Sequence, residues 1–263
     1  MKSIWLHIKK TEQTCPTCGN RLYQHKLNPD VLTCMECGRK RLDEKDKELE
    51  YLGGEMALKH DTYDVFYKNS IVEDITLKGA SFDSYETNDS ETAENKQKAM
   101  DIANKYLQGA AFNAILQGKQ GTGKSHLAIS ILKQINENSK PYKKCLFIDF
   151  ASIVAQVRDF KDETTISEGQ AIKMMSEADY LVIDDIGAEA MTIGNGSKEF
   201  IYRILQAVMQ ARQGKSTILT TNLSSADLSN LYGSKLTSRL LRGIKGHAVI
   251  FRKTTDKRMD YEF

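Results

Sequence analysis

Short apolar runs alternate with helical segments over the last two-thirds of the chain. The runs lack polar alternation, and they predict strands at residues 113–117, 145–150, 180–184, 217–220 and 248–251. Before and between these strands, apolar positions three or four residues apart predict helices, clearest at 92–107 and 125–136. Strands that are apolar on both faces need cover on both sides, and the connections are long enough for crossover helices. The pattern predicts an α/β fold, a parallel sheet with helices on both faces.

The first third of the chain follows a different pattern. Residues 39–50, RKRLDEKDKELE, carry five basic and five acidic side chains, which is typical of a solvated helix or a linker. Residues 51–80 contain a Gly-Gly pair and no long periodic pattern, so they are expected to continue this connection. We therefore expect a small cysteine-rich domain at 1–38, a charged linker or helical connection at 39–78, and the α/β domain at 79–263.

Amino-acid composition limits the classes of protein to which this chain can belong. A chain of 263 residues with 40% hydrophobic residues is long enough to bury a sizeable core. No run approaches the roughly 20 apolar residues of a membrane span, and the polar N-terminus lacks the core of a signal peptide. These features predict a cytoplasmic protein without membrane contact. The net charge of +2 decides nothing, although residues 233–263 hold eight Lys/Arg against three Asp/Glu, suited to a polyanion or simply to a solvated surface.

GKQGTGKS at residues 118–125 fits the phosphate-loop pattern G-x-x-x-x-G-K-[ST] between a predicted strand and a predicted helix. Glycines let the backbone turn tightly and aim N–H groups at phosphate oxygens, and the helix adds its positive N-terminal end. Lys124 is expected to reach the β- and γ-phosphates, and the Ser125 hydroxyl to ligate Mg²⁺. The predicted nucleotide-binding residues are Gly118, Lys119, Gln120, Gly121, Thr122, Gly123, Lys124, Ser125 and His126.

Two later strands end in polar side chains suited to phosphoryl chemistry. YLVIDD (180–185) ends in two carboxylates, of which we assign Asp184 to Mg²⁺ and Asp185 to activation of the attacking water. The side chain of Asp185 is shorter than that of a glutamate, so its carboxylate reaches less far toward the attacking water. TILTTN (217–222) ends in Asn222, which either orients water beside the γ-phosphate or merely forms a turn. These residues predict Mg²⁺-dependent hydrolysis of ATP.

The cysteines form two closely spaced pairs. Cys15 and Cys18 are followed by Cys34 and Cys37 in the pattern C-x₂-C-x₁₅-C-x₂-C, the spacing of a structural zinc ribbon. Four thiolates complete a tetrahedral Zn²⁺ site and leave no open position for catalysis. Redox dithiols are the alternative, and nearby histidines (His7, His25) are not needed as ligands. A fifth cysteine, Cys145, lies in an apolar run and is expected in the core.

Four motifs together resemble one family of ATPases. They are GKQGTGKSHLA (118–128), ADYLVIDDIGAE (178–189), ILTTNL (218–223) and LYGSKLTSRLLRG (231–243). The chain resembles the AAA+ ATPases, specifically the DnaC/DnaI-type replicative helicase loaders, and it is also similar to the IstB-type transposition ATPases. The resemblance implies a P-loop AAA+ sheet at about residues 80–260, no lid domain, and an N-terminal zinc-binding domain that engages a hexameric helicase.

The same resemblance assigns further residues. It implies that Asn222 is the sensor residue and that Arg239 is an arginine finger acting in trans on ATP bound by a neighbouring subunit, with Arg242 as the rival. Arg258 is a weak candidate for a second sensor arginine. Such loaders contact single-stranded DNA after the second strand, where the residues suited to bases and phosphates are Arg158, Phe160 and Lys161.

The leading hypothesis is an ATP-dependent loader that binds the replicative helicase and single-stranded DNA. ATP hydrolysis would then switch helicase deposition during initiation of DNA replication. One alternative is an ATPase that regulates DNA transposition. A second is a non-catalytic ATP-binding inhibitor of a host loader or helicase. A metabolic P-loop kinase is a third, but it leaves the cysteine pairs unexplained.

Overall fold

The computed structural model describes residues 8–158, 166–189 and 198–256. By its internal contacts the chain divides into two compact units, Met1–Leu58 and Lys59–Phe263. The domain limits expected from the sequence, 1–38, 39–78 and 79–263, stay a prediction. Each unit is described by itself below.

The smaller unit is an antiparallel sheet followed by a long helix. Its strands are β1 (Ile8–Thr14), β2 (Arg21–His25) and β3 (Asn28–Thr33), with β2 in the middle, and helix α1 spans Met35–Asp61. Among the described residues of this unit, only Cys15 and Cys34 are buried. The unit therefore has almost no apolar core, and a small fold of this kind needs another source of stability.

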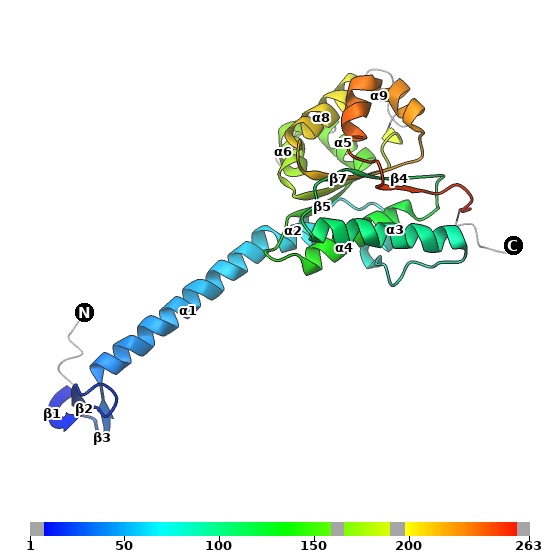
Figure 1. Ribbon diagram of the computed structural model, residues 1–263. Coiled ribbons are helices and arrows are strands. Elements are labelled where there is room, and N and C mark those ends of the chain that lie inside the picture. The colour runs from blue at the N-terminus through cyan, green and yellow to red at the C-terminus, as the bar shows by residue number, and fades with distance from the viewer. Residues whose placement is uncertain (1–7, 159–165, 190–197, 257–263) are drawn as a thin grey trace. The chain divides into compact units, whose positions relative to one another are not determined.

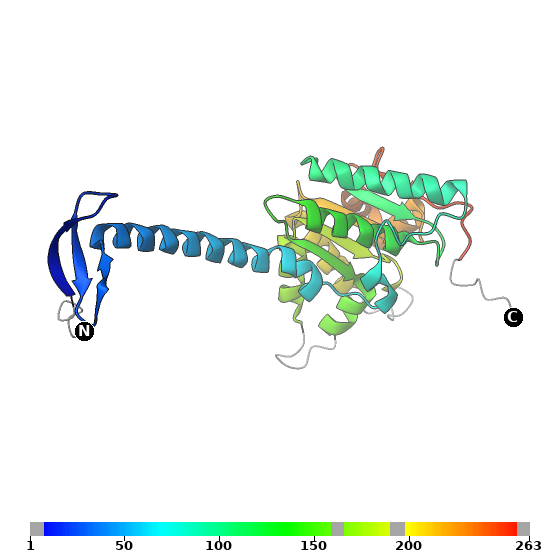
Figure 2. The same cartoon turned by 90° about the horizontal axis from the view of Figure 1, so that it is seen from below.

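The larger unit is built on a five-stranded parallel sheet in the order β5-β6-β7-β4-β8 (Figures 1 and 2). The strands are β4 (Ala114–Gln117), β5 (Cys145–Asp149), β6 (Tyr180–Asp184), β7 (Ser216–Thr221) and β8 (Ala248–Ile250). The helices are α2 (Tyr63–Asn69), the 3₁₀ helix η2 (Ile75–Gly79), α3 (Ser90–Leu107), α4 (Lys124–Asn138), α5 (Phe150–Arg158), α6 (Glu168–Glu177), α8 (Lys198–Ala211) and α9 (Ser225–Leu240). The predicted α/β class with a parallel sheet is confirmed.

Helices cover both faces of this sheet, so successive side chains of each strand enter two different hydrophobic cores. Phe147 and Val182 belong to the core beneath α3 and α4. Their strand neighbours Ile148 and Ile183 belong to the core beneath α5, α6, α8 and α9 (Figure 1). Successive side chains of a strand point to opposite faces of the sheet, and here both faces are buried beneath helices. This is why the strands read as continuous apolar runs in the sequence.

The segment between α2 and η2 packs along the edge of the sheet. Ile71 forms a parallel bridge with Ile148, its N–H donates to the carbonyl of Phe147, and Phe66 of α2 is buried in the core. This pairing carries the nearby Glu73 and Asp74 into the lining of a cavity that also includes the end of β5. Among the described residues, no helix is both long and apolar enough to cross a bilayer.

Arg212, directly after α8, ties the amino ends of the strands together. Its side chain is only 2% exposed and donates to the Thr217 hydroxyl and to the carbonyls of Met175, Ala178, Asp179 and Ser216. Burial lowers the pKa of this guanidinium to about 10. Every one of these acceptors loses its donor if the guanidinium is removed.

We expect Arg212→Met to lower the free energy of unfolding by about 3 kcal/mol or more, because buried carbonyls lose their partners. Urea denaturation measures the change. The matched control is Arg203→Met, which removes an exposed ion pair with Glu168 and is expected to lower the free energy of unfolding far less. Equal losses for the two variants would contradict the role assigned to Arg212.

Candidate nucleotide site and cysteine cluster

The phosphate loop joins the carboxyl end of β4 to the first turn of α4. Gly121 and Gly123 have φ of 72° and 93°, a region that L side chains rarely adopt. Lys124 is 6% exposed, and its ammonium donates to the carbonyl of Lys119 and to Oδ1 of Asn222, both at 2.7 Å. Thr122 Oγ1 donates to the same Lys119 carbonyl at 2.9 Å. The ammonium is thus held between the phosphate loop and the residue that follows β7.

Asp184 lies at the end of β6 next to the loop. It is 5% exposed and accepts from Thr220 Oγ1 at 2.6 Å. Burial raises its pKa to about 6, although hydrogen bonds from Thr220 and Ser125 favour the charged form. The carboxylate and the Ser125 hydroxyl therefore adjoin. Paired oxygen donors of this kind suit a hard divalent cation, which would offset the burial of the charge.

Asp185 is held in an unusual backbone conformation. Its φ of 52° makes it the one described non-glycine residue with positive φ. Its N–H donates to Thr220 Oγ1 at 2.8 Å, and its Oδ1 accepts from Asn222 Nδ2 at 3.1 Å. Asn222 therefore bridges Lys124 to Asp185 through its two amide atoms. Strained residues of this kind concentrate at functional sites.

These side chains line one cavity of about 330 Å³. Sequence reasoning missed three acidic members of its lining, Glu73, Asp74 and Asp149. Asp149 is paired in register with Asp184 across β5 and β6. The available signal was that CLFIDF, like YLVIDD, is an apolar run followed by a carboxylate.

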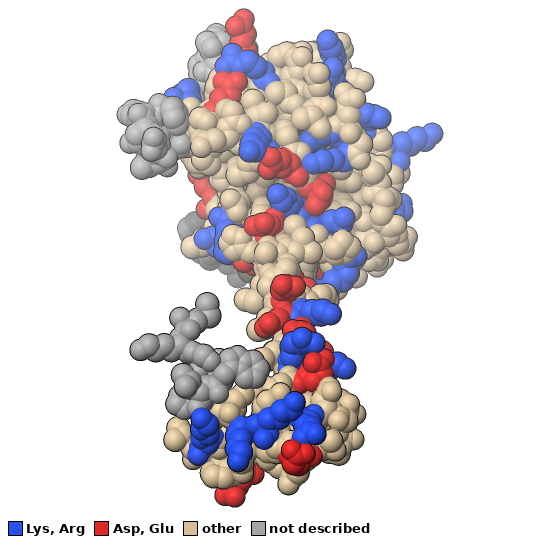
Figure 3. Space-filling model, turned by 90° about the vertical axis from the view of Figure 1, so that its left-hand side faces the viewer, with Lys and Arg blue, Asp and Glu red and all other residues tan. Residues whose placement is uncertain are grey.

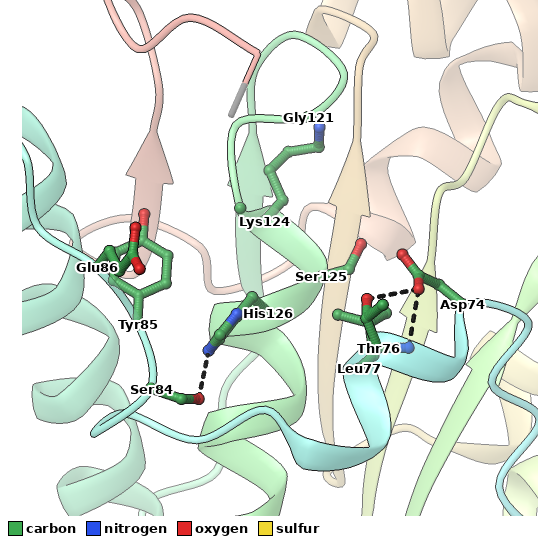
Figure 4. A pocket seen from close by; sticks show the side chains of 11 residues that line it. Asp74, Thr76, Leu77, Ser84, Tyr85, Glu86, Gly121, Lys124, Ser125 and His126 are labelled. Atoms are coloured by element: carbon green, nitrogen blue, oxygen red, sulfur yellow. Dashed lines mark hydrogen bonds between the residues drawn. The ribbon is translucent and has the colours of Figure 1, made fainter. Parts of the chain in front are cut away.

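A second pocket of about 220 Å³ adjoins the loop on its other side (Figure 4). His126 lines it, with its Nε2 at 2.9 Å from the Ser81 carbonyl and 3.2 Å from Ser84 Oγ. The Tyr85 ring meets His126 edge-on at 5.2 Å between centroids and lies against Gly123, where a Cβ atom would be 2.8 Å from Tyr85 Cε2. The sequence predicted His126 here but not the contribution of residues 81–86.

The segment after β8 passes directly over the phosphate loop. A Cβ at Gly118 would lie 2.5 Å from Phe251 Cβ, and one at Gly121 would overlap the Asp256 carboxylate. Glu91 on α3 anchors this segment by accepting from the backbone N–H groups of residues 252–254 and from the Thr254 hydroxyl. Burial raises the pKa of Glu91, but these donors outweigh it and bring the pKa to about 2.

Arg239 lies in the last turn of α9, away from the phosphate loop of its own chain. It lines a separate cavity with Asn113, Arg212 and Arg242 at the amino ends of the strands. The Asn113 amide donates to the carbonyls of Arg239 and Leu240. Strand β4 separates Asn113 from the loop by about 13 Å. Among the described residues, none accepts from the buried Nη1 of Arg239.

The residues expected to contact DNA are only partly described. Arg158 is exposed at the end of α5, whose Val154 and Val157 are buried in the core. Phe160 and Lys161 lie outside the described residues, as does Arg258. On the face of the larger unit shown in Figure 3, basic and acidic side chains are interspersed.

The four N-terminal cysteines converge on one point. Their Sγ atoms all lie within 4.8 Å of one another, with Cys15 and Cys37 at 3.8 Å and Cys18 and Cys34 at 3.4 Å. Sulfur atoms bound tetrahedrally to zinc at about 2.3 Å are about 3.8 Å apart. Backbone N–H groups of Thr17 and Cys18 lower the pKa of Cys15 to about 6, whereas hydrogen bonds with Cys18 and Cys34 raise the pKa of Cys37 to about 12, so the thiols of the cluster titrate together. The cluster fits structural zinc.

Removal of zinc is expected to unfold the smaller unit, because its buried side chains are two of the ligands. Metal analysis should find one Zn²⁺ per chain, and a chelator should remove it with loss of β signal in circular dichroism. Cys34→Ser should bind zinc at least about tenfold more weakly, whereas Cys145→Ser, in the other unit, should keep it. Full zinc binding by Cys34→Ser would contradict the assignment.

Comparison with known proteins agrees with a nucleotide site at the phosphate loop. The family model of IstB-like ATP binding proteins matches residues 72–258, more than half of the chain. The chain belongs to this family. Individual relatives and solved structures extend the comparison to replication proteins.

The replicative helicase loader DnaC of Escherichia coli K12 is 29% identical over 169 residues, which cover 63% of this chain and 64% of DnaC. DnaC of Buchnera aphidicola from Schizaphis graminum is 26% identical over 154 residues. The chain thus spans less than two-thirds of the length of these relatives. In fold, this IstB-like chain is similar to the crystal structure of the DnaC helicase loader, with a TM-score of 0.54 and 22% identity over 68% of this chain and 99% of that one. It is also similar to the crystal structure of DnaI, with a TM-score of 0.51 and 17% identity over 69% of this chain and 93% of that one.

Proposed function

We propose that the protein is a Mg²⁺-dependent ATPase that loads a replicative helicase onto single-stranded DNA. The observation that carries the ATPase part is the hydrogen-bonded chain from Lys124 through Asn222 to Asp185, beside the Ser125–Asp184 pair. The relatives named helicase loaders support the loading part.

In this proposal the loop N–H groups and Lys124 bind the β- and γ-phosphates of ATP. Ser125 and Asp184 would hold Mg²⁺, and the ion would supply positive charge to offset the charge that develops on the phosphoryl oxygens. Asp185 accepts a proton from the attacking water, and Asn222 fixes its carboxylate and reports the state of the γ-phosphate through Lys124. The adjoining pocket at Tyr85 and His126 leaves room for the nucleoside.

Arg239 acts in trans in the proposal. It lies at the amino ends of the strands, whereas its own phosphate loop follows the carboxyl end of β4. A guanidinium from a neighbouring subunit would make hydrolysis depend on assembly. Arg242, exposed in the same cavity, is the second candidate for this role.

Two further interactions complete the proposal. DNA is bound by Arg158, Phe160 and Lys161, and the helicase is bound by the zinc-bound unit. It places the protein in the cytoplasm, where the helicase acts. The matching family model favours a second candidate function, regulation of DNA transposition together with a transposase.

A pull-down of the cognate replicative helicase by the full-length protein, with and without ATP, tests the loading function. We expect association in at least one nucleotide state. No association in either state would contradict loading while leaving the ATPase proposal intact. Capture of a transposase from the same genome in place of the helicase would favour the second candidate.

A further inference from the structure

Helix α1 of the smaller unit carries a stripe of exposed apolar side chains. Leu42, Leu49 and Met56 are seven residues apart, and Leu52 follows Leu49 by three. Their exposures are 62%, 57%, 73% and 45% in that order. At 100° per residue these four side chains fall on one side of the helix, in the a and d positions of a heptad repeat.

Helix α1 gains little stability from burial of side chains within its own unit. None of its 27 residues is buried. Gly53 and Gly54, in its second half, are weak helix formers. An unsupported amphipathic helix of this kind gains most of its stability from packing its apolar side against a partner.

We propose that α1 pairs with α1 of a second copy of this chain as a parallel two-stranded coiled coil. In parallel register, Leu42, Leu49, Leu52 and Met56 each meet their own counterpart, which gives four apolar layers. The d positions next to Leu52 in the repeat are Lys45 and Lys59. In antiparallel register these lysines face a positions and displace most of the apolar contacts, whereas in parallel register each lysine meets its own counterpart and extends its ammonium to solvent.

The charges that flank the stripe favour the same arrangement. In a parallel coiled coil a g residue faces the e residue five positions later in the partner. Arg41 and Asp46 occupy these positions, so that the pair forms twice across the symmetric dimer. Glu48 faces Gly53 and meets no like charge. This interface is independent of the proposed loader function and of any contact made through Arg239.

The test is the mass of the zinc-loaded, nucleotide-free, full-length protein by light scattering. The wild type is expected to have twice its chain mass of 29.7 kDa. Leu49→Glu should give the monomer. The matched control, Tyr51→Glu, changes a residue of similar exposure (67% against 57% for Leu49) on the other side of α1 and should stay dimeric. Unchanged zinc content and ATP binding show that each variant is folded.

Charge exchange tests the orientation. Arg41→Asp or Asp46→Arg alone should weaken dimerisation about fivefold to tenfold, and the double variant should recover most of it. A monomeric wild type, or equal effects of Leu49→Glu and Tyr51→Glu, would overturn the proposal. So would failure of the double variant to recover. A monomeric wild type whose helicase binding is lost in Leu49→Glu would assign the stripe to the helicase instead.

Discussion

Lys124→Ala is expected to raise the Kd for ATP by about 100-fold, because a buried ammonium that makes charge-assisted hydrogen bonds to phosphate is lost. In the structure the same ammonium is held by the Lys119 carbonyl and by Asn222, ready to exchange these acceptors for phosphate oxygens. Titration with a fluorescent ATP analogue in the presence of Mg²⁺ measures the change.

Lys119→Ala is the matched control for this experiment. It removes the same charge from the same loop, but the Lys119 side chain is exposed and only its carbonyl contacts Lys124. Its Kd is expected to stay within about threefold of the wild type, as for other exposed charges. Equal loss of affinity in both variants would mean that net charge, rather than the position of Lys124, governs binding.

Arg239→Ala is expected to lower ATP turnover by about 1000-fold while leaving the Kd for ATP unchanged, because an arginine finger stabilises only the transition state. Steady-state phosphate release measures turnover. Mixing Arg239→Ala with Lys124→Ala should restore part of the activity, because the first subunit keeps an intact phosphate loop and the second an intact Arg239.

Arg242→Ala serves as the control for the choice of arginine. It is exposed in the cavity that holds Arg239, and we expect its turnover to stay within about threefold of the wild type. Loss of turnover in Arg242→Ala alone would move the finger to that residue. Absence of recovery in the mixture would contradict action in trans.

Much of the fold and half of the site were predictable because their signals are local. Strand β6 spans the predicted residues 180–184, since an apolar run buried on both faces has the same signature wherever it lies. The phosphate loop requires glycines at positive φ, a need visible in the sequence itself. Four cysteines at ribbon spacing are equally local, and their convergence agrees with the zinc prediction.

The remaining features depend on contacts between distant parts of the chain. Nothing near Glu73 indicates that Ile71 pairs with Ile148 and carries this carboxylate to the sheet edge. The position of Tyr85 against Gly123, 38 residues later, is likewise a matter of tertiary packing. The roles of Asn222 and Arg239 needed the family resemblance, because an amide after a strand or an arginine on a helix has no distinctive local pattern.

ATP turnover by the wild type and by Asp185→Asn tests the central claim most directly. The substitution keeps the size of the side chain and its contact with Asn222 but removes the base. The account predicts measurable turnover by the wild type, at least about 100-fold lower turnover by Asp185→Asn, and a similar Kd for ATP in both. Equal turnover in the two proteins, or none above background in the wild type, would contradict it.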